Sequence, residues 1–301
     1  MKNKKLEANL AMMVSRVFSG INVNALKYLL PLWVIPTTFV SMRILFGALA
    51  FWFIARFVPE ERSTRRERVY MLLLGAVGMF GYMLLYLLGI SRTTPVSSAI
   101  FSSLQPIWVL LISVIFLSEK ISGKKVIGIA IGLCGALLCI TSQKNADVAS
   151  APLVGDMCCL ASSVIFAVYL LLSNILLKKV GTITLMKYVF TGASVPALIT
   201  TIFSGGHSLA FTSSVEWFPI MVILFVLIFP TVITYLLIPI GLKYLSTTVV
   251  AIYNYLTLIV TALIALLIGQ DHFTLSQLLA ILLIFTSVYL VERAESTIPA
   301  S

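Results

Sequence analysis

The feature that most constrains this chain is a succession of apolar segments, each about 20 residues long, separated by short polar or basic turns. A helix needs about 20 mostly apolar residues to cross the hydrocarbon core of a bilayer. Ten segments reach or approach that length, at residues 10–30, 33–58, 69–90, 96–117, 126–142, 153–177, 183–203, 217–240, 247–268 and 275–291. The sequence therefore predicts an all-α integral membrane protein of ten transmembrane helices.

The composition agrees with a surface that faces lipid. Of the 301 residues, 60% are hydrophobic and 11% are charged, whereas about a quarter of the residues of a soluble domain are charged. The net charge of +10 comes from the short basic turns, so we expect a lipid bilayer and no nucleic acid as partner. The first residues resemble the basic start of a signal peptide, but no small-residue cleavage site follows, and we expect residues 10–30 to remain as the first span.

Lysine and arginine residues are distributed unevenly between the two ends of the predicted helices. With the N-terminus in the cytoplasm, fifteen lie at inner ends and turns, and three, Lys27, Arg92 and Lys144, lie at outer ones. Positively charged turns stay on the cytoplasmic side of the membrane. We therefore expect the chain in the bacterial inner membrane with both termini in the cytoplasm.

The two halves of the sequence share a pattern. A shift of 152 residues places Gly89–Leu117 over Gly241–Gly269 without a gap, and a shift of 147 places Ser19 over Phe166. Each half holds five predicted helices, an odd number, so the second half must enter the membrane upside down relative to the first. Inverted repeats of this kind are common in secondary transporters, whose binding site lies between the repeats. We expect one repeat at 9–142, a second at 153–292 and a short cytoplasmic tail at 293–301.

Short motifs in the first half carry a family resemblance. They are SSAI at 97–100, QPI at 105–107 and LSEKIS at 117–122, followed by Gly128, Gly132 and Gly135. Together with SGIN at 19–22, Lys27 and Arg43, these motifs make residues 9–292 similar to the EamA-type repeats of the drug/metabolite transporter superfamily. The resemblance implies ten helices, both termini inside, a central cavity, and export or exchange of small metabolites.

The second half departs from that family pattern at two places. Leu258 stands at the position of Pro106, and Gln270-Asp271 stands where a glutamate is usual. The resemblance therefore does not imply that the two halves contribute equally to the site.

Polar side chains recur at helical spacing on several predicted helices, as at Ser15, Ser19 and Asn22. Polar groups within a membrane usually face protein or a water-filled cavity. We therefore predict a cavity for a small-molecule solute, lined by Arg16, Asn22, Arg43, Tyr82, Tyr86, Ser98, Ser102, Gln105, Tyr169, Thr234, Tyr235, Tyr253 and Asn254. Three alternatives stay open. Ser and Thr residues could bond neighbouring helices, Arg16 could reach the headgroups, and Arg43 could bond helix-end carbonyls.

Prolines and glycines suggest where the helices bend and pack. Pro106 and Pro230 each remove a backbone hydrogen bond within a span and predict either hinges or static kinks. Gly128 and Gly132 give the helix at 126–142 a face of small residues. That face could pack within the protein or against a second copy, so we expect a monomer or a homodimer.

The chemistry of the spans favours transport over catalysis. No Asp, Glu or His lies near the middle of a predicted span, so an intramembrane active site or a proton relay has no obvious residues. The four cysteines form no CxxC pair, and we expect neither a metal nor a cofactor. We expect a secondary transporter and not an enzyme. We expect it to move amino-acid-like or amphipathic metabolites across the membrane as an exporter, an exchanger or a facilitator.

Other functions remain open at this point. One is a carrier for anionic sugar-phosphate or nucleotide-sugar solutes, and another is a membrane scaffold that transports nothing. The arginines within spans also permit an anionic group on the solute, such as a carboxylate, because the guanidinium group can bind a carboxylate through two parallel hydrogen bonds.

Overall fold

The computed structural model describes residues 2–30, 32–59, 63–117, 123–142, 150–204, 216–270 and 275–295. Within these ranges the chain is helical apart from short turns and contains no β-strand. Seven of the helices in them are long and apolar enough to cross a membrane. The prediction of an all-helical membrane protein is confirmed, whereas the count of ten spans stays a prediction.

Most helices begin and end within a few residues of the predicted spans, whereas α1 begins at Lys2, well before residue 10. In chain order they are α1 (Lys2–Leu29), α2 (Pro36–Ala55), α3 (Arg65–Leu73), η1 (Leu74–Met79), α4 (Phe80–Ile90), α5 (Pro95–Ser103), α6 (Gln105–Leu117), α7 (Gly123–Ser142), α8 (Pro152–Leu177), α9 (Thr182–Phe203), α10 (Trp217–Val226), η3 (Leu227–Ile233), α11 (Thr234–Tyr244), α12 (Thr247–Ile252), α13 (Asn254–Leu267) and α14 (Leu275–Glu295).

Irregular turns interrupt the third and fourth predicted spans of each half. The π-helical segments η1 and η3 lie within the third spans. Single turn residues, Leu104 and Tyr253, divide α5 from α6 and α12 from α13 in the fourth spans. Pro106 explains the first division, since it has no N–H to donate to the carbonyl of Ser102. Segments of π-helix within α-helices are frequent at functional sites.

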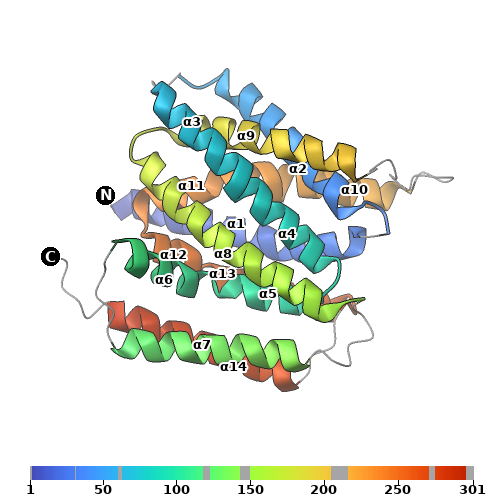
Figure 1. Ribbon diagram of the computed structural model, residues 1–301, viewed down its shortest axis with the longest axis vertical. Coiled ribbons are helices and arrows are strands. Elements are labelled where there is room, and N and C mark those ends of the chain that lie inside the picture. The colour runs from blue at the N-terminus through green and yellow to red at the C-terminus, as the bar shows by residue number, and fades with distance from the viewer. Residues whose placement is uncertain are drawn as a thin grey trace.

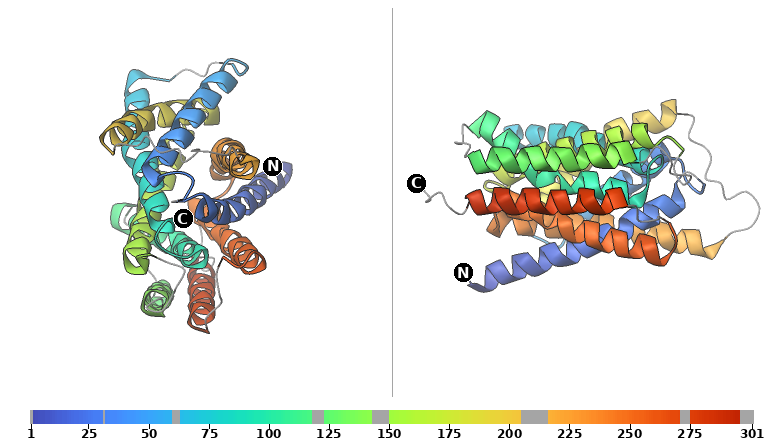
Figure 2. Two further views of the ribbon diagram at one scale, coloured as in Figure 1. Left: turned by 90° about the vertical axis from the view of Figure 1, so that its right-hand side faces the viewer. Right: turned by 90° about the horizontal axis from the view of Figure 1, so that it is seen from below.

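Helices from the two halves of the sequence pack against each other throughout the bundle. The pairs with the most extensive contacts are α7 with α14, α2 with α9, α4 with α8, and α1 with both α11 and α13. Figures 1 and 2 show α7 and α14 at one edge of the bundle, running in opposite directions. In Figure 1, α1 and α8 also run in opposite directions, and the start of α1 lies at the same end as the finish of α14.

Two glycines allow η1 and α9 to cross at close range. A Cβ atom on Gly75 would lie 1.9 Å from the carbonyl oxygen of Val189, and one on Gly192 would lie 2.0 Å from the carbonyl oxygen of Leu72. Glycine has no such atom, so the two backbones can approach closely. The π-helical turn therefore lies against α9 in a contact that only glycine permits.

Large apolar side chains cover the outside of the bundle. Leu49, Val77 and Leu267 are 73%, 71% and 83% exposed, respectively. Many further Leu, Ile, Val and Phe side chains are exposed as well, which is unfavourable in water but suits a lipid solvent. The interior holds large buried side chains such as Phe39, Phe101 and Phe190.

Candidate solute-binding cavity

A cavity with polar walls lies inside the bundle, between helices of both halves. It is lined by Arg16, Ser19, Asn22, Val23, Arg43, Tyr82, Tyr86, Ser102, Gln105, Phe166, Pro230, Thr234, Tyr235, Ile238, Asn254 and Thr257. Its volume, measured as space open to the centres of water molecules, is about 60 Å³. A single water needs about 10–15 Å³ by that measure, so the cavity holds a few waters and must widen to admit a metabolite.

The structure brings most of the predicted site residues together on this wall. Ten of the thirteen line it, namely Arg16, Asn22, Arg43, Tyr82, Tyr86, Ser102, Gln105, Thr234, Tyr235 and Asn254. They come from α1, α2, α4, α5, α6, α11 and α13. Whether these side chains contact a solute stays a prediction.

Three predicted residues, Ser98, Tyr169 and Tyr253, are not among the described residues that line this cavity. The Ser98 hydroxyl donates to the carbonyl of Pro95 in its own helix. Tyr169 is buried behind the wall and stacks on Phe166, with 5.6 Å between the ring centroids. The Tyr253 hydroxyl donates to Asn9 Oδ1 at 2.9 Å. A helical stripe identifies a face of a helix but not how far along that face the cavity extends.

Sequence reasoning missed several lining residues. Ser19 and Thr257 lie at helical spacing from Asn22 and Asn254, so the sequence carried a signal for them, but they were not among the residues predicted to line the cavity. Phe166 had a weak signal, because it aligns with Ser19 when the halves are shifted by 147 residues. Val23 and Ile238 carry no signal, since apolar residues on a cavity wall look like core residues in a sequence.

Close packing of α1 against α13 positions Arg16. Gly20 lies against Val260, where a Cβ atom on the glycine would come within 2.6 Å of the valine side chain. The hydroxyl groups of Thr257 and Thr261 donate to the carbonyls of Arg16 and Gly20, each at 3.3 Å. These bonds fix the position of α1 along its axis and its rotation about that axis. They thereby determine where the side chain of Arg16 leaves the helix.

Arg16 is a buried cation with unused hydrogen-bond donors. Its side chain is 4% exposed, and its Nε and Nη2 atoms are buried without a hydrogen-bond partner in the described chain. The neighbouring Asn22 likewise has an unpartnered buried Oδ1. No acidic side chain occurs among the described residues that line the cavity. An unpaired charge in the membrane interior is costly, so this arrangement favours an anion beside Arg16.

Arg43 is anchored by the hydroxyl group of the residue that follows Pro230. The proline has no N–H to donate to the carbonyl of Val226, four residues earlier. The hydroxyl of Thr231 donates to that carbonyl at 2.8 Å. The same hydroxyl oxygen accepts a hydrogen bond from Arg43 Nε at 3.0 Å. The π-helical segment η3 thereby anchors the second cation of the cavity.

Aromatic rings form another part of the wall. Tyr82 and Tyr86 stack with 6.2 Å between their centroids, and Tyr82 lies 4.4 Å from the ring of Phe166. Tyr235 meets Phe190 edge-on at 5.4 Å. The cavity therefore combines two buried cations, amide groups and aromatic faces, which suits a small molecule with an anionic group and an apolar part.

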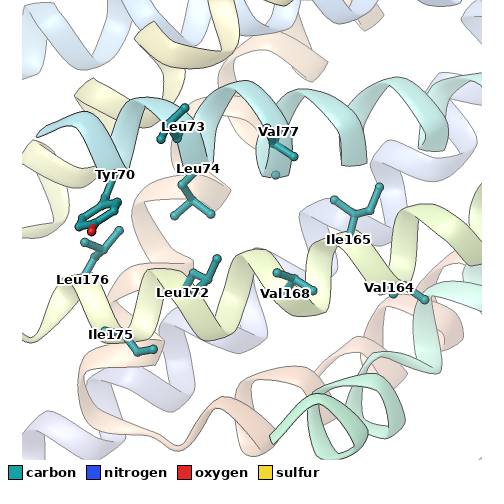
Figure 3. Close-up of a pocket in the computed structure, with 11 residues that line it drawn as sticks. Tyr70, Leu73, Leu74, Val77, Val164, Ile165, Val168, Leu172, Ile175 and Leu176 are labelled. Atoms are coloured by element: carbon teal, nitrogen blue, oxygen red, sulfur yellow. The ribbon is translucent and has the colours of Figure 1, made fainter. Parts of the chain in front are cut away.

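A larger hollow elsewhere in the bundle has a different character. It measures about 560 Å³ and lies between α8 and the α3–η1 segment, and nearly all of its lining is Leu, Ile and Val. Figure 3 shows Leu74 and Leu172 directed toward each other across it. Because Leu73 and Val77 beside it are exposed on the outside of the bundle, this hollow suits a lipid chain rather than a polar solute.

The glycines of α7 lie at a helix contact within the protein. The hydroxyl of Ser287 on α14 donates to the carbonyl of Gly128 at 2.6 Å. A Cβ atom on Gly132 would lie 2.2 Å from Ile107 Cδ1. Neither α7 nor α14 supplies a described residue to the cavity wall. In the described ranges, no group of three His, Cys, Asp or Glu side chains lies close enough to hold a metal ion.

Similarity to known proteins agrees with these features. The sequence pattern of the EamA-like transporter family matches residues 6–141 and again residues 153–293. This chain belongs to the EamA-like transporter family. Its membership makes it a membrane transporter and points away from an enzyme.

Individual relatives carry related names. The chain is 24% identical over 272 residues to the uncharacterized transporter YyaM of Bacillus subtilis, covering 88% of this chain and 87% of that protein. It is 28% identical over 179 residues to an uncharacterized transporter of Archaeoglobus fulgidus, covering 60% and 62%. One crystal structure matches with a TM-score of 0.69 at 17% identity, covering 98% of this chain and 100% of that one. That similarity concerns the fold alone.

Proposed function

We propose that this EamA-like protein is a secondary carrier for small, amino-acid-like or amphipathic metabolites that bear a carboxylate. The observation that carries the proposal is Arg16, a buried cation whose Nε and Nη2 atoms lack partners in a cavity that also contains Arg43. A carboxylate on the solute would satisfy these donors and offset the cost of the buried charge.

The other walls of the cavity favour this class of solute. The rings of Tyr82 and Phe166 offer an apolar face, and the amides of Gln105 and Asn254 can bond polar groups. Phosphorylated and nucleotide-linked sugars are the second candidate, since arginine also binds phosphate. We rank them second because Arg16 and Arg43 are the only cations among the described residues that line the cavity.

We further propose that the chain crosses the bacterial inner membrane ten times, as two inverted repeats that work by alternating access. The two segments that match the family, 6–141 and 153–293, support this division. The corresponding places of η1 and η3 in the two halves, and the presence of a single-residue turn in the fourth predicted span of each half, support it as well. Secondary transporters with inverted repeats commonly carry discontinuous helices at the binding site.

A transport assay tests the proposed function. Purified protein is screened by thermal shift against carboxylates, their amides, sugar phosphates and nucleotide sugars, and the hits are tested by counterflow in proteoliposomes. We expect carboxylates to raise Tm and to exchange, and their neutral amides to do neither. Absence of flux for every solute in the panel would favour the scaffold alternative.

Variants of the two arginines make the test specific. Arg16→Gln and Arg43→Lys should lose carboxylate exchange, whereas the exposed Arg66, whose Nε donates to Tyr70, provides a matched control as Arg66→Gln. If both cavity variants insert and move carboxylates at the wild-type rate, the anion proposal is wrong.

The orientation of the chain has its own test. We propose that both termini lie in the cytoplasm, because the basic turns concentrate at that end. Reporter tags at the two ends should both report from the cytoplasm. Tags on opposite faces of the membrane would contradict an even number of spans and the inverted repeat with it.

A further inference from the structure

A second polar pocket lies at the end of the bundle where α1 begins, away from the solute cavity. It has a volume of about 480 Å³ and is lined by Trp52, Ala55, Arg56, Val58, Pro59, Thr182, Ile183, Thr184, Lys187 and Lys243. These residues come from the end of α2, the residues that follow it, the start of α9 and the end of α11. Three cations and no acidic side chain occur among them.

Lys187 is the residue that requires an explanation. Its side chain is only 8% exposed, and its Nζ has no hydrogen bond or ion pair with the described residues. The ammonium group instead lies over two aromatic rings, 4.5 Å from the centroid of Trp52 and 5.0 Å from that of Tyr188. Cation–π contacts orient the ammonium group and stabilise it in part. They supply no counter-charge.

The N-terminus of α9 adds further donors to the same pocket. The residue before the helix, Gly181, has no side chain and cannot cap it. The first backbone N–H groups of a helix have no partner within the helix, and here they belong to Thr182, Ile183 and Thr184, which line the pocket. Uncapped N–H groups together with the helix dipole favour an anion.

The surroundings indicate where such an anion would come from. Phe53 and Phe57 are neighbours in the sequence of the lining residues Trp52 and Arg56, are 60% and 74% exposed, and pack together with 5.1 Å between their ring centroids. Trp52, on the wall of the pocket, is half exposed. A molecule with a phosphate in the pocket could therefore lay hydrocarbon chains along these rings. Basic pockets between helices on the cytoplasmic side are typical sites for acidic lipid headgroups.

We propose that this pocket binds the phosphate group of an anionic phospholipid from the membrane leaflet on the side of the basic turns. Lys187 and the start of α9 hold the phosphate, while Arg56 and Lys243 interact with it from the rim. The bound lipid joins α2, α9 and α11 at one end of the bundle.

Lipid binding can be measured directly, without knowing the solute. Full-length protein in mild detergent is titrated with phosphatidylglycerol or phosphatidylcholine, and bound lipids are counted by native mass spectrometry. We expect tighter binding of phosphatidylglycerol, weakened about fivefold in each of Lys187→Gln and Lys243→Gln. The matched control is Lys178→Gln, which changes an exposed lysine at the end of α8 and should bind as wild type does.

Two further arms separate the lipid from other occupants. Inorganic phosphate in excess should not displace phosphatidylglycerol, because it has no chains to lie along Phe53 and Phe57. The acidic residues Glu60 and Glu61 follow Pro59 in the sequence, outside the described residues, and Glu60→Gln/Glu61→Gln should leave lipid binding unchanged or tighter.

Several results would overturn the proposal. They are equal binding of the two lipids, wild-type lipid binding by both lysine variants, and displacement of phosphatidylglycerol by inorganic phosphate. Lys243 is exposed, so its variant remains informative even if Lys187→Gln fails to fold.

Discussion

The side-chain amide of Asn254 donates a hydrogen bond to Gln105 Oε1 in the wall of the cavity. Each residue is the first of a helix that follows a single-residue turn, Gln105 after Leu104 and Asn254 after Tyr253. The bond therefore joins the two discontinuous helices at the points where they are interrupted. Both side chains are buried and line the cavity, so a solute that entered would compete with this bond.

Truncating either amide leaves the other without its partner. Gln105→Ala and Asn254→Ala should each lower the free energy of unfolding by about 1–3 kcal/mol. The double variant should lose less than the sum, because both changes remove one interaction. Thermal unfolding of the four proteins in one detergent measures this coupling.

A second pair of residues checks that the coupling is specific. Asn174 Nδ2 donates to Thr247 Oγ1 at 2.8 Å, outside the cavity. Asn174→Ala combined with Gln105→Ala should show additive losses. If Gln105→Ala and Asn254→Ala are equally additive, the two amides do not interact in solution.

Replacing Arg16 with an apolar residue should increase the stability of the protein. Arg16→Met keeps a long side chain but removes a buried cation with unpartnered donors, and we expect the protein without solute to become more stable by about 1–3 kcal/mol. Carboxylate exchange should be lost. A rise in Tm together with loss of flux is the expected result.

Arg43→Met should have the opposite effect on the stability of the protein. Arg43 Nε is bonded to Thr231 Oγ1, so its removal should lower Tm. Equal effects of the two methionine variants on stability would contradict the distinction between an unpartnered and an anchored arginine.

The sequence predicted an all-helical membrane protein, and ten of the sixteen described residues that line the cavity, for physical reasons. The length of apolar runs fixes the spans, and polar groups such as Asn22 and Gln105 are placed in a membrane only at a cost. The limits of the cavity were less predictable. Tyr169 lies at helical spacing from the polar residues Ser162 and Ser173, yet its ring stacks on Phe166 and is not among the described residues that line the cavity.

Other features depend on contacts between distant segments. The π-helical turn η1 contains no proline, and its packing against α9 through Gly75 and Gly192 is visible only in three dimensions. In the sequence, Lys187 lies near the inner end of the predicted span 183–203, where lysine side chains commonly reach the headgroups. Its burial beside Trp52 depends on the pairing of α2 with α9, which no local pattern contains.

The crossing of η1 and α9 should not tolerate even one added methyl group. Gly75→Ala and Gly192→Ala would each place a Cβ atom about 2 Å from a carbonyl oxygen of the other helix, and should cost about 1–3 kcal/mol through forced separation of the backbones. Gly123→Ala is the control, since no atom of the described residues lies within 4 Å of its Cβ position. Comparison of Tm values checks this, and unchanged Tm in the first two variants would contradict the crossing.

The end of the bundle opposite the termini is held by a buried carboxylate. Thr93 Oγ1 donates to Asp156 Oδ1 at 2.5 Å, while Asp156 Oδ2 is buried without a hydrogen-bond partner among the described residues. Lys27 Nζ donates to the carbonyl of Thr93 at 2.6 Å, so α1, the turn before α5 and the start of α8 meet here.

At this contact, a change to the carboxyl group should cost less stability than a change to the hydroxyl group that donates to it. Asp156→Asn keeps an oxygen that can accept from Thr93, and should reduce stability little. Thr93→Val has the same shape but no hydroxyl, which leaves both oxygens of Asp156 without a donor, and should cost about 1–3 kcal/mol. Thr200→Val, which loses a bond to a carbonyl of its own helix, serves as the control. If Thr93→Val melts at the same temperature as Asp156→Asn, the hydroxyl does not stabilise the carboxyl group, and the packing of Gly89 against Cys159 would be left to hold this end of the bundle together.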